Sequence, residues 1–121
     1  MMILADTSVW IDHLRSANAA LFDRLDQGVI LMHPFVRGEL MLGGLPPGLV
    51  TDFRLLPQAP AATPEETEAL IDAGGLGGRG IGYVDAALLA SVRLHGAARL
   101  WTNDKRLAAI ADEMSVGLTA P

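Results

Sequence analysis

The chain has 121 residues, half of them hydrophobic, with nine Lys or Arg against fourteen Asp or Glu and a formal net charge of −5. This length indicates a single domain spanning residues 1–121, with enough apolar material for a packed core. The lack of cysteine excludes a disulfide framework and a thiolate metal site. We find no signal-peptide pattern and no apolar run of membrane-spanning length, so we expect a cytoplasmic protein without a membrane partner.

The N-terminal half reads as alternating short strands and helices. A strand at Met2–Ala5 is apolar throughout, and a helix follows at Ser8–Arg15. A glycine at position 28 ends the second helix. The further elements expected in this half are a helix at Ala19–Asp26, a strand at Val29–Met32, a helix at Pro34–Leu42 and a short helix at Pro46–Leu55.

The C-terminal half begins with a clear helix start. Thr63 is the expected N-cap, Pro64 takes the first helical position and Glu66 completes a capping box, so a helix is predicted as far as Ala73. The glycine-rich segment Gly74–Gly82 is expected to be a mobile loop beside the functional site. Expected after it are a helix at Tyr83–His95, a strand at Arg99–Trp101, a helix at Asp104–Glu113 and a strand at Val116–Leu118. Strands separated by helices predict an α/β fold, with a short central parallel sheet flanked by helices on both faces.

Four of the fourteen acids do not fit a solvated helix face. Asp6 and Asp104 each follow a predicted strand, at the edge where open α/β sheets bind ligands. Glu39 and Asp85 each have mostly apolar neighbours three and four residues away on a helix. Those neighbours are Phe35, Val36, Leu42 and Gly43 for the first, and Ile81, Gly82, Leu88 and Leu89 for the second. A lone carboxylate buried in such a place would cost on the order of several kcal/mol.

Each of these acids also has a purely structural interpretation. The two strand-end acids precede helices and are equally expected as N-caps. The two helix acids could pair with Arg37 and Arg79, although neither arginine shares the helix face of the acid beside it. The coincidence of all four in a small domain with few cations favours one shared site. Mg²⁺ or Mn²⁺, which take oxygen ligands, would relieve the repulsion and activate water for an in-line displacement at phosphorus.

Other polar residues lie close to the four acids in sequence. Ser8, Thr102 and Asn103 are candidates to orient the acids or water, or to cap helices. Candidates to bind phosphate, with ordinary surface charge as the equal alternative, are Arg37, Arg79, Lys105 and Arg106. Without the four acids, ten acids face nine Lys and Arg, so the remaining charge of −1 does not exclude a nucleic-acid substrate. Structural roles are expected for His13, His33 and His95, and core positions for Trp10 and Trp101.

The chain resembles PIN-domain ribonucleases, and specifically the toxin subunits of VapBC-type toxin–antitoxin pairs. The resemblance is carried, in the family's order, by ILADTSVWIDHLR, HPFVRGELMLG, GIGYVDAALLASVRL and LWTNDKRLAAIA. The family's four acids and two hydroxyl positions fall on Asp6, Glu39, Asp85, Asp104, Ser8 and Thr102. The four acids are the same four that their positions single out above.

This resemblance implies a PIN fold that cleaves RNA endonucleolytically with Mg²⁺ or Mn²⁺ held by the four acids. It also implies a homodimer and a higher assembly in which a cognate antitoxin blocks the site. Asp85 or Asp104 is the more suitable of the four to help deprotonate the attacking water. Two short helices, Ser8–Arg15 and Pro34–Leu42, are rich in large apolar side chains and predict an exposed groove for an amphipathic partner helix.

Several other functions stay open from sequence alone. A non-toxic PIN-fold RNA-processing nuclease would carry the same acids. A haloacid-dehalogenase-like phosphatase usually has a second aspartate two residues after the first, where this chain has Ser8. A receiver-like signalling domain matches Asp6-Thr7 and Asp104-Lys105 poorly, and a non-catalytic interaction module would need no acid cluster.

Overall fold

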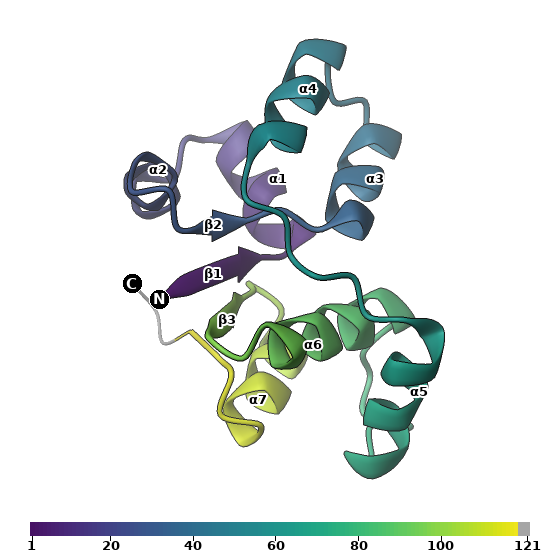
Figure 1. Cartoon of the computed structure of the whole chain (residues 1–121). Coiled ribbons are helices and arrows are strands. Elements are labelled where there is room, and N and C mark those ends of the chain that lie inside the picture. The colour runs from purple at the N-terminus through teal and green to yellow at the C-terminus, as the bar shows by residue number, and fades with distance from the viewer. Residues whose placement is uncertain (119–121) are drawn as a thin grey trace.

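A three-stranded parallel sheet with the strand order β2-β1-β3 forms the centre of the computed structural model, which describes residues 1–118 (Figure 1). The middle strand β1 (Met2–Ala5) pairs with β2 (Ile30–Leu31) and with β3 (Ala98–Trp101). The last pair of the β1–β3 ladder is Ala5 with Trp101. The chain segments that follow these two strands therefore leave the sheet side by side, at its carboxyl edge.

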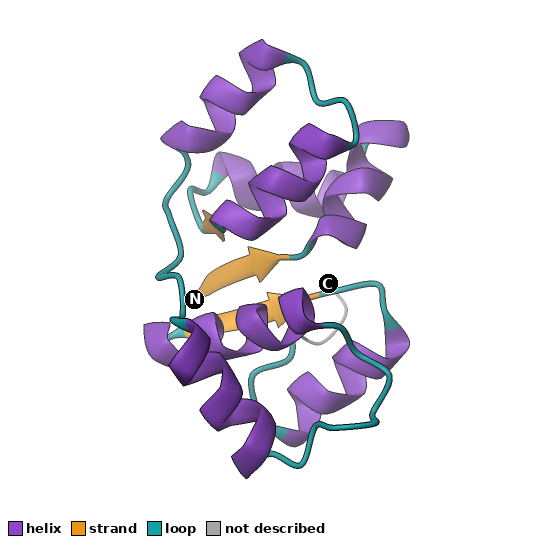
Figure 2. Cartoon of the chain, turned by 90° about the vertical axis from the view of Figure 1, so that its right-hand side faces the viewer, coloured by secondary structure: helices purple, strands orange, loops and turns teal. Residues whose placement is uncertain are grey.

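Seven helices surround this sheet in the described part of the chain. They are α1 (Thr7–Arg15), α2 (Ala19–Asp26), α3 (Pro34–Leu42), α4 (Pro47–Leu55), α5 (Pro64–Ala73), α6 (Tyr83–His95) and α7 (Lys105–Glu113). Figures 1 and 2 show α1 to α4 grouped on the β2 side of the molecule and α5 to α7 on the β3 side. Within residues 1–118 no helix combines the length and the apolar character needed to cross a membrane.

Local capping explains where several helices begin. Thr63 and Glu66 form the predicted capping box at α5, with both of its hydrogen bonds present. The ring of His33 accepts a hydrogen bond from the Phe35 N–H and caps α3, which has proline at its first position. Asp6 and Asp104 cap α1 and α7. The N-cap interpretation of the two strand-end acids is thus correct, and it does not prevent them from sharing a site.

The core lies between the sheet and the inner faces of the helices. Leu4, Val9 and Leu100 are at most 1% exposed, and the half of α6 from Ala86 to Val92 is buried without interruption. Trp10 and Trp101 are 2% and 7% exposed, as expected for core residues. This packing holds the carboxyl edge of the sheet and the helices around it in one arrangement.

The observed elements follow the predicted ones closely, with one clear error. Every predicted helix is present, and its ends differ from the prediction by at most one residue. The strand expected at Val29–Met32 is shorter, and Met32 only forms an isolated bridge to Gln58. The strand expected at Val116–Leu118 is absent as an element of the described residues, where Gly117 makes a single bridge to Leu100. The two backbone hydrogen bonds of this bridge join Leu100 N to Val116 O and Leu118 N to Leu100 O, and the segment begins directly after a turn in which Ser115 has φ 60°.

Candidate active site

Asp6 is the most enclosed of the four acids, with only 5% of its surface exposed. Its Oδ1 accepts hydrogen bonds from the Ser8 hydroxyl at 2.5 Å and from the Val9 N–H at 3.2 Å. Its Oδ2 accepts a hydrogen bond from the Thr102 hydroxyl. The carboxylate at the end of β1 is therefore held in one orientation by donors from both neighbouring strand ends.

The loop that follows β3 is tied to the same place. The Thr102 hydroxyl accepts a hydrogen bond from the Asp104 N–H at 3.0 Å, and the Ser8 hydroxyl accepts one from the Asn103 N–H at 3.0 Å. One carboxylate oxygen of Asp104 accepts a hydrogen bond from the Arg106 N–H at 2.8 Å and so caps α7. The other oxygen of this exposed side chain takes no part in the cap. The two hydroxyls predicted to support the acids thus join β1 to β3.

Glu39 lies on an exposed face of α3, not on the buried apolar face that the sequence predicted. Val36 and Leu40 point into the core, whereas Phe35 and Leu42 beside Glu39 are 40% and 90% exposed. Of the predicted apolar neighbours only Val36 is buried, so the side of α3 that carries Glu39 and Phe35 faces outward. The Thr7 hydroxyl donates to Oε1 of Glu39 at 2.5 Å and links α1 to α3.

Asp85 is half-buried at the start of α6, and its environment brings all four acids together. Burial is the main cause that raises the pKa of its carboxyl above the ordinary value. The negative charges of Asp6, Asp104 and Glu39 raise this pKa further, while the hydrogen bond from the Gly82 N–H acts in the opposite direction. Asp85 therefore lies close enough to the other three acids, which come from three other segments of the chain, to interact with each of them electrostatically.

The donor chemistry of this site suits a hard divalent cation, although its ligands are not assembled around one. Within residues 1–118 no three His, Cys, Asp or Glu side chains are arranged to hold a metal ion among them. Asp6 and Glu39 are instead bonded to hydroxyls. Carboxylate oxygens without histidine or thiolate favour Mg²⁺ or Mn²⁺, and Mg²⁺ usually binds through one or two carboxylates and keeps several waters. The chemistry of the donors therefore fits such an ion, although their arrangement does not form a complete ligand set.

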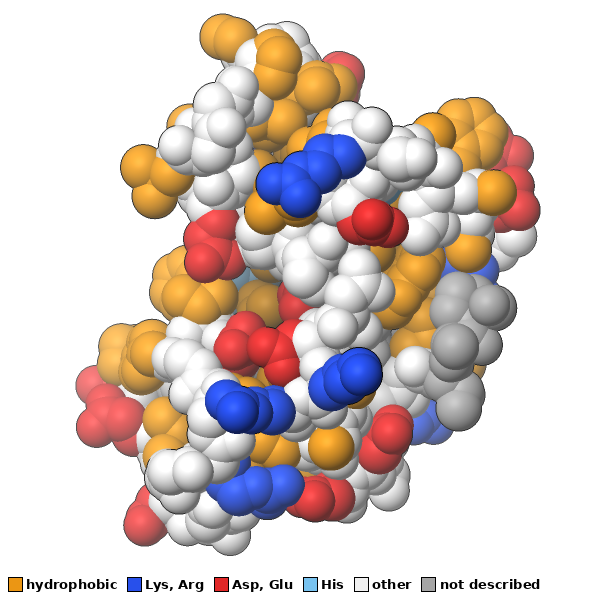
Figure 3. All heavy atoms as spheres, turned by 180° about the vertical axis from the view of Figure 1, so that it is seen from behind, with side chains coloured by type: hydrophobic (Ala, Val, Ile, Leu, Met, Phe, Trp, Pro, Cys, Tyr) orange, Lys and Arg blue, Asp and Glu red, His pale blue; other side chains and the backbone are white. Residues whose placement is uncertain are grey.

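The four predicted phosphate-binding residues differ in whether another side chain already neutralises their charge. Arg79 is bound in a fork to Glu113, with contacts of 2.9 and 3.1 Å, and this is the one ion pair among residues 1–118. Arg37 donates to the neutral amide oxygen of Gln58 at 3.1 Å, so its charge stays uncompensated. Lys105 and Arg106 are exposed beside Asp104. In the view of Figure 3, acidic side chains gather around a hollow, and Lys and Arg side chains border its lower side.

The glycine-rich segment reaches the site through a close contact with Arg106. Gly80 has φ +84°, and a Cβ on it would come within 2.7 Å of Nη1 and 2.8 Å of Cδ of Arg106. The positive φ favours glycine at this position, and without a Cβ the arginine side chain lies directly against the loop backbone. Together with the Arg79–Glu113 ion pair, this contact attaches the loop to α7.

The three histidines are structural, as predicted. The Nδ1 atoms of His13, His33 and His95 accept hydrogen bonds from backbone N–H groups two to five residues later in the chain. The Nε2 atom of His33 also contacts the Ser91 hydroxyl at 3.0 Å. Because its Nδ1 acts as an acceptor, the neutral ring carries its proton on Nε2 and donates it to Ser91.

An apolar groove adjoins Glu39, where the sequence predicted one. It has a volume of about 530 Å³ and lies between α1, α3 and the segment that begins α4. Ile11, Leu14, Leu40, Leu45 and Leu49 supply its apolar lining, and Glu39 and Arg15 lie on it as well. The groove thus leads from an exposed apolar surface to one of the four acids.

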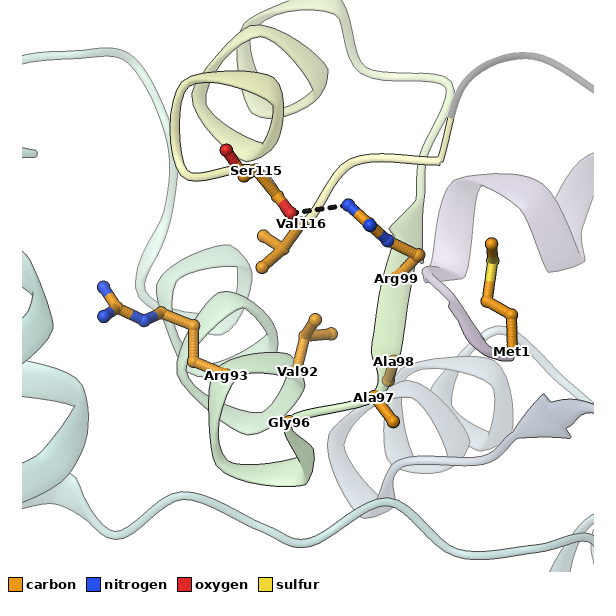
Figure 4. A pocket seen from close by; sticks show the side chains of 9 residues that line it. All are labelled: Met1, Val92, Arg93, Gly96, Ala97, Ala98, Arg99, Ser115 and Val116. Atoms are coloured by element: carbon orange, nitrogen blue, oxygen red, sulfur yellow. Dashed lines mark hydrogen bonds between the residues drawn. The ribbon is translucent and has the colours of Figure 1, made fainter.

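A second pocket lies at the opposite, amino edge of the sheet. It has a volume of about 410 Å³, and Figure 4 shows Arg93 and Arg99 on two sides of it. Arg99 donates to the backbone oxygen of Ser115 at 2.5 Å. None of the four acids lines this pocket, so its position does not connect it with the carboxylate site.

Sequence reasoning missed Thr7, which contacts Glu39 directly. The signal was available in the segment Asp6-Thr7-Ser8, where two hydroxyls follow the acid at the end of β1. Thr7 and Ser8 are adjacent on the helix, so their side chains point in different directions, and only that of Ser8 donates a hydrogen bond to Asp6. The packing of α3 against α1 shows that the Thr7 hydroxyl donates to Glu39.

Comparison with known proteins identifies the family. The model of the PIN domain family matches residues 3–113. The chain belongs to the PIN-domain family. This PIN domain is 49% identical over 119 residues to Ribonuclease VapC32 of Mycobacterium tuberculosis strain CDC 1551 / Oshkosh, an alignment that covers 97% of this chain and 96% of the relative. Ribonuclease VapC32 of strain ATCC 25618 / H37Rv matches it with the same identity and coverage.

Proposed function

We propose that this PIN-domain protein is a divalent-metal-dependent endoribonuclease and the toxin of a type II toxin–antitoxin pair of the VapBC type. The observation that carries the nuclease proposal is the electrostatic coupling of Asp85 to Asp6, Asp104 and Glu39. Uncompensated carboxylates are kept together at a structural cost, and a site for a hard cation gives a reason for it. The ribonuclease name of relatives aligned over nearly the whole chain supports RNA as the substrate.

In this proposal the four acids hold Mg²⁺ or Mn²⁺. The bound cation would supply positive charge that activates the attacking water and stabilises the oxygens of an in-line displacement at phosphorus. Asp6 keeps its orientation through Ser8 and Thr102, so it is the acid best suited to a constant ligand position. Asp85, whose pKa is raised by burial and by its acidic neighbours, is the acid best suited to accept a proton from water.

Phosphate binding is best assigned to Arg106 and Lys105, with Arg37 as a further contributor. Arg106 lies against Gly80 beside the Asp104 strand end, and its guanidinium is not paired with an acid in the described residues. Arg79 is a weaker candidate because Glu113 already neutralises it. Asn103 acts in this proposal through its backbone, which donates to Ser8.

The direct test of the nuclease is RNA cleavage by protein purified free of contaminating nuclease. Cleavage is expected with Mg²⁺ or Mn²⁺ and not with EDTA, and a comparison of the two ions at equal concentration identifies the preferred one. Sequencing of the RNA ends formed after brief induction in cells would locate the cleavage sites. Full cleavage in the presence of chelator would contradict a metal-dependent mechanism.

The apolar groove beside Glu39 supports the proposed antitoxin. An amphipathic helix could cover Ile11, Leu14 and Leu49, and a chain leaving that helix would meet the carboxylates. An arginine or lysine in that segment would neutralise the acids as a metal ion would, so inhibition should weaken as the Mg²⁺ concentration rises. Co-expression with the protein encoded by the neighbouring gene, followed by pull-down and a cleavage assay, tests this. The proposal includes a homodimer, a larger toxin–antitoxin assembly and a cytoplasmic location.

A non-toxic RNA-processing nuclease of the same family is the second candidate. It would show the same metal-dependent cleavage, but growth would continue after induction and the neighbouring gene product would neither bind nor inhibit. The phosphatase and receiver interpretations lose their support, because the PIN family model matches residues 3–113. The ribonuclease name of the aligned relatives argues against a non-catalytic module.

A further inference from the structure

Three of the six aromatic residues are exposed, and one of these shares a helix face with a site acid. Trp10, Phe53 and Trp101 are buried in the core, whereas Phe22, Tyr83 and Phe35 are 63%, 49% and 40% exposed. Phe35 precedes Glu39 by four residues in α3, so the two side chains are neighbours on the same exposed face. Tyr83 precedes Asp85 by only two residues and projects from a different face of α6.

The ring of Phe35 is restrained by a buried neighbour. It packs edge-on against His33, with ring centroids 5.1 Å apart and an angle of 64° between the planes. His33 is only 1% exposed and is itself bound to Ser91 of α6. Phe35 therefore offers a partly exposed aromatic surface whose position is set by the core, which lowers the entropy lost when something stacks on it.

The position of Phe35 suits the substrate better than a protein partner. It is not among the residues that line the apolar groove, which begins on the other side of Glu39 at Leu40 and Gly43. Neighbouring side chains four residues apart on a helix have Cβ atoms about 5–6 Å apart. A base attached to a nucleotide whose phosphate lies at the acids can reach that far.

We propose that Phe35 is a base-stacking platform, on which one unpaired base next to the cleaved phosphodiester bond lies. This inference rests on the proposed ribonuclease function and assigns Phe35 to the binding of one base of the RNA substrate. Proteins that bind single-stranded RNA stack bases on exposed aromatic side chains, and such stacking tolerates any base because every base has a π-face. A base paired within a duplex is already stacked and cannot reach the ring.

The test uses a single-stranded 12-nucleotide RNA of mixed sequence with 2-aminopurine at its centre, whose fluorescence falls when the base stacks. Asp85→Asn protein in Mg²⁺ serves as the parent, so that the probe is not cleaved during titration. The parent is expected to quench the probe, and Phe35→Leu on that background is expected to bind about tenfold more weakly with little quenching. Phe35→Tyr should retain both properties. Phe22→Leu is the matched control, because α2 precedes β2 and so lies toward the amino edge of the sheet.

The outcomes separate this inference from the proposed function. Equal binding and quenching by Phe35→Leu and the parent would overturn it, as would a parent that does not quench the probe. A Phe35→Leu protein that binds the probe normally but loses the neighbouring gene's product would show a protein contact instead, and would also overturn it. Melting temperatures of all variants establish that they are folded. If wild-type protein cleaves no RNA with either metal ion, it is the ribonuclease proposal that fails.

Discussion

The hydroxyl of Thr102 donates a hydrogen bond to Oδ2 of Asp6, and so joins two residues that lie 96 positions apart in the chain. Each of the two follows a strand of the same ladder, whose last pair is Ala5 with Trp101. Parallel pairing therefore brings together an acid from the first residues and a hydroxyl from the last fifth of the chain. The site depends on this pairing, because the hydrogen bond orients Asp6, the one carboxylate among residues 1–118 that is almost fully buried.

Thr102→Val should reduce cleavage while the protein stays folded. Valine keeps the size of the side chain but removes the donor to Asp6 and the acceptor for the Asp104 N–H. Loss of a residue that orients a metal ligand typically costs about 10–100-fold in metal affinity or activity. Cleavage rates measured across a Mg²⁺ titration check this, with Thr51→Val on the exposed side of α4 as the control. If the variant cleaves RNA with the wild-type Mg²⁺ dependence, the Thr102 hydroxyl does not support metal binding.

Asp85→Asn should abolish activity and raise the melting temperature of the metal-free protein. Because the folded-state pKa of Asp85 lies above its ordinary value, the ionised form opposes folding at neutral pH, and the neutral amide removes that opposition. Loss of a ligand and proton acceptor should cost more than about 100-fold in rate. Thermal unfolding in EDTA and cleavage in Mg²⁺ measure the two effects, with the exposed Asp52→Asn as the matched control. If the variant is inactive and also less stable than wild type, Asp85 has a structural role and the metal-site proposal for it is contradicted. Asp6→Asn is a less clean test because Asp6 also caps α1.

Stability should fall as the pH decreases from about 6.5 to about 4 through His33. Burial, helped by the charge of Arg37, lowers the pKa of His33 from 6.5 to about 4, so in this range the unfolded chain binds a proton that the folded protein does not. The contribution is complete above pH 6.5, and a shift of this size corresponds to about 3 kcal/mol lost by pH 4. Denaturant unfolding at several pH values measures it. His33→Asn, which can still cap α3 but does not titrate, should show a flatter profile over this range. An unchanged slope would exclude His33 as the cause.

Arg106→Gln should weaken RNA binding more than Arg79→Gln. Glutamine keeps most of the side chain that lies against Gly80 but removes the charge proposed to meet phosphate. Arg79 is already paired with Glu113, so its removal should change binding little. Binding measured against salt concentration should show a slope reduced by about one for Arg106→Gln. Equal slopes for wild type and Arg106→Gln would argue that this charge does not contact the RNA.

Local signals in the sequence determined the helices and the two longer strands, and they singled out the four acids as candidates. Caps such as Thr63, the glycines that end helices, and the apolar periodicity of Tyr83–His95 act over a few residues, so they can be read without the fold. The tertiary structure decided the rest. It placed the Thr7 hydroxyl against Glu39, which is 32 residues away in the chain, and left Phe35 and Leu42 beside Glu39 exposed. It also neutralised Arg79 with Glu113 and reduced the last strand to a single bridge. These outcomes depend on which elements pack together. Patterns among neighbouring residues cannot predict them, because each contact joins segments that are far apart in the chain.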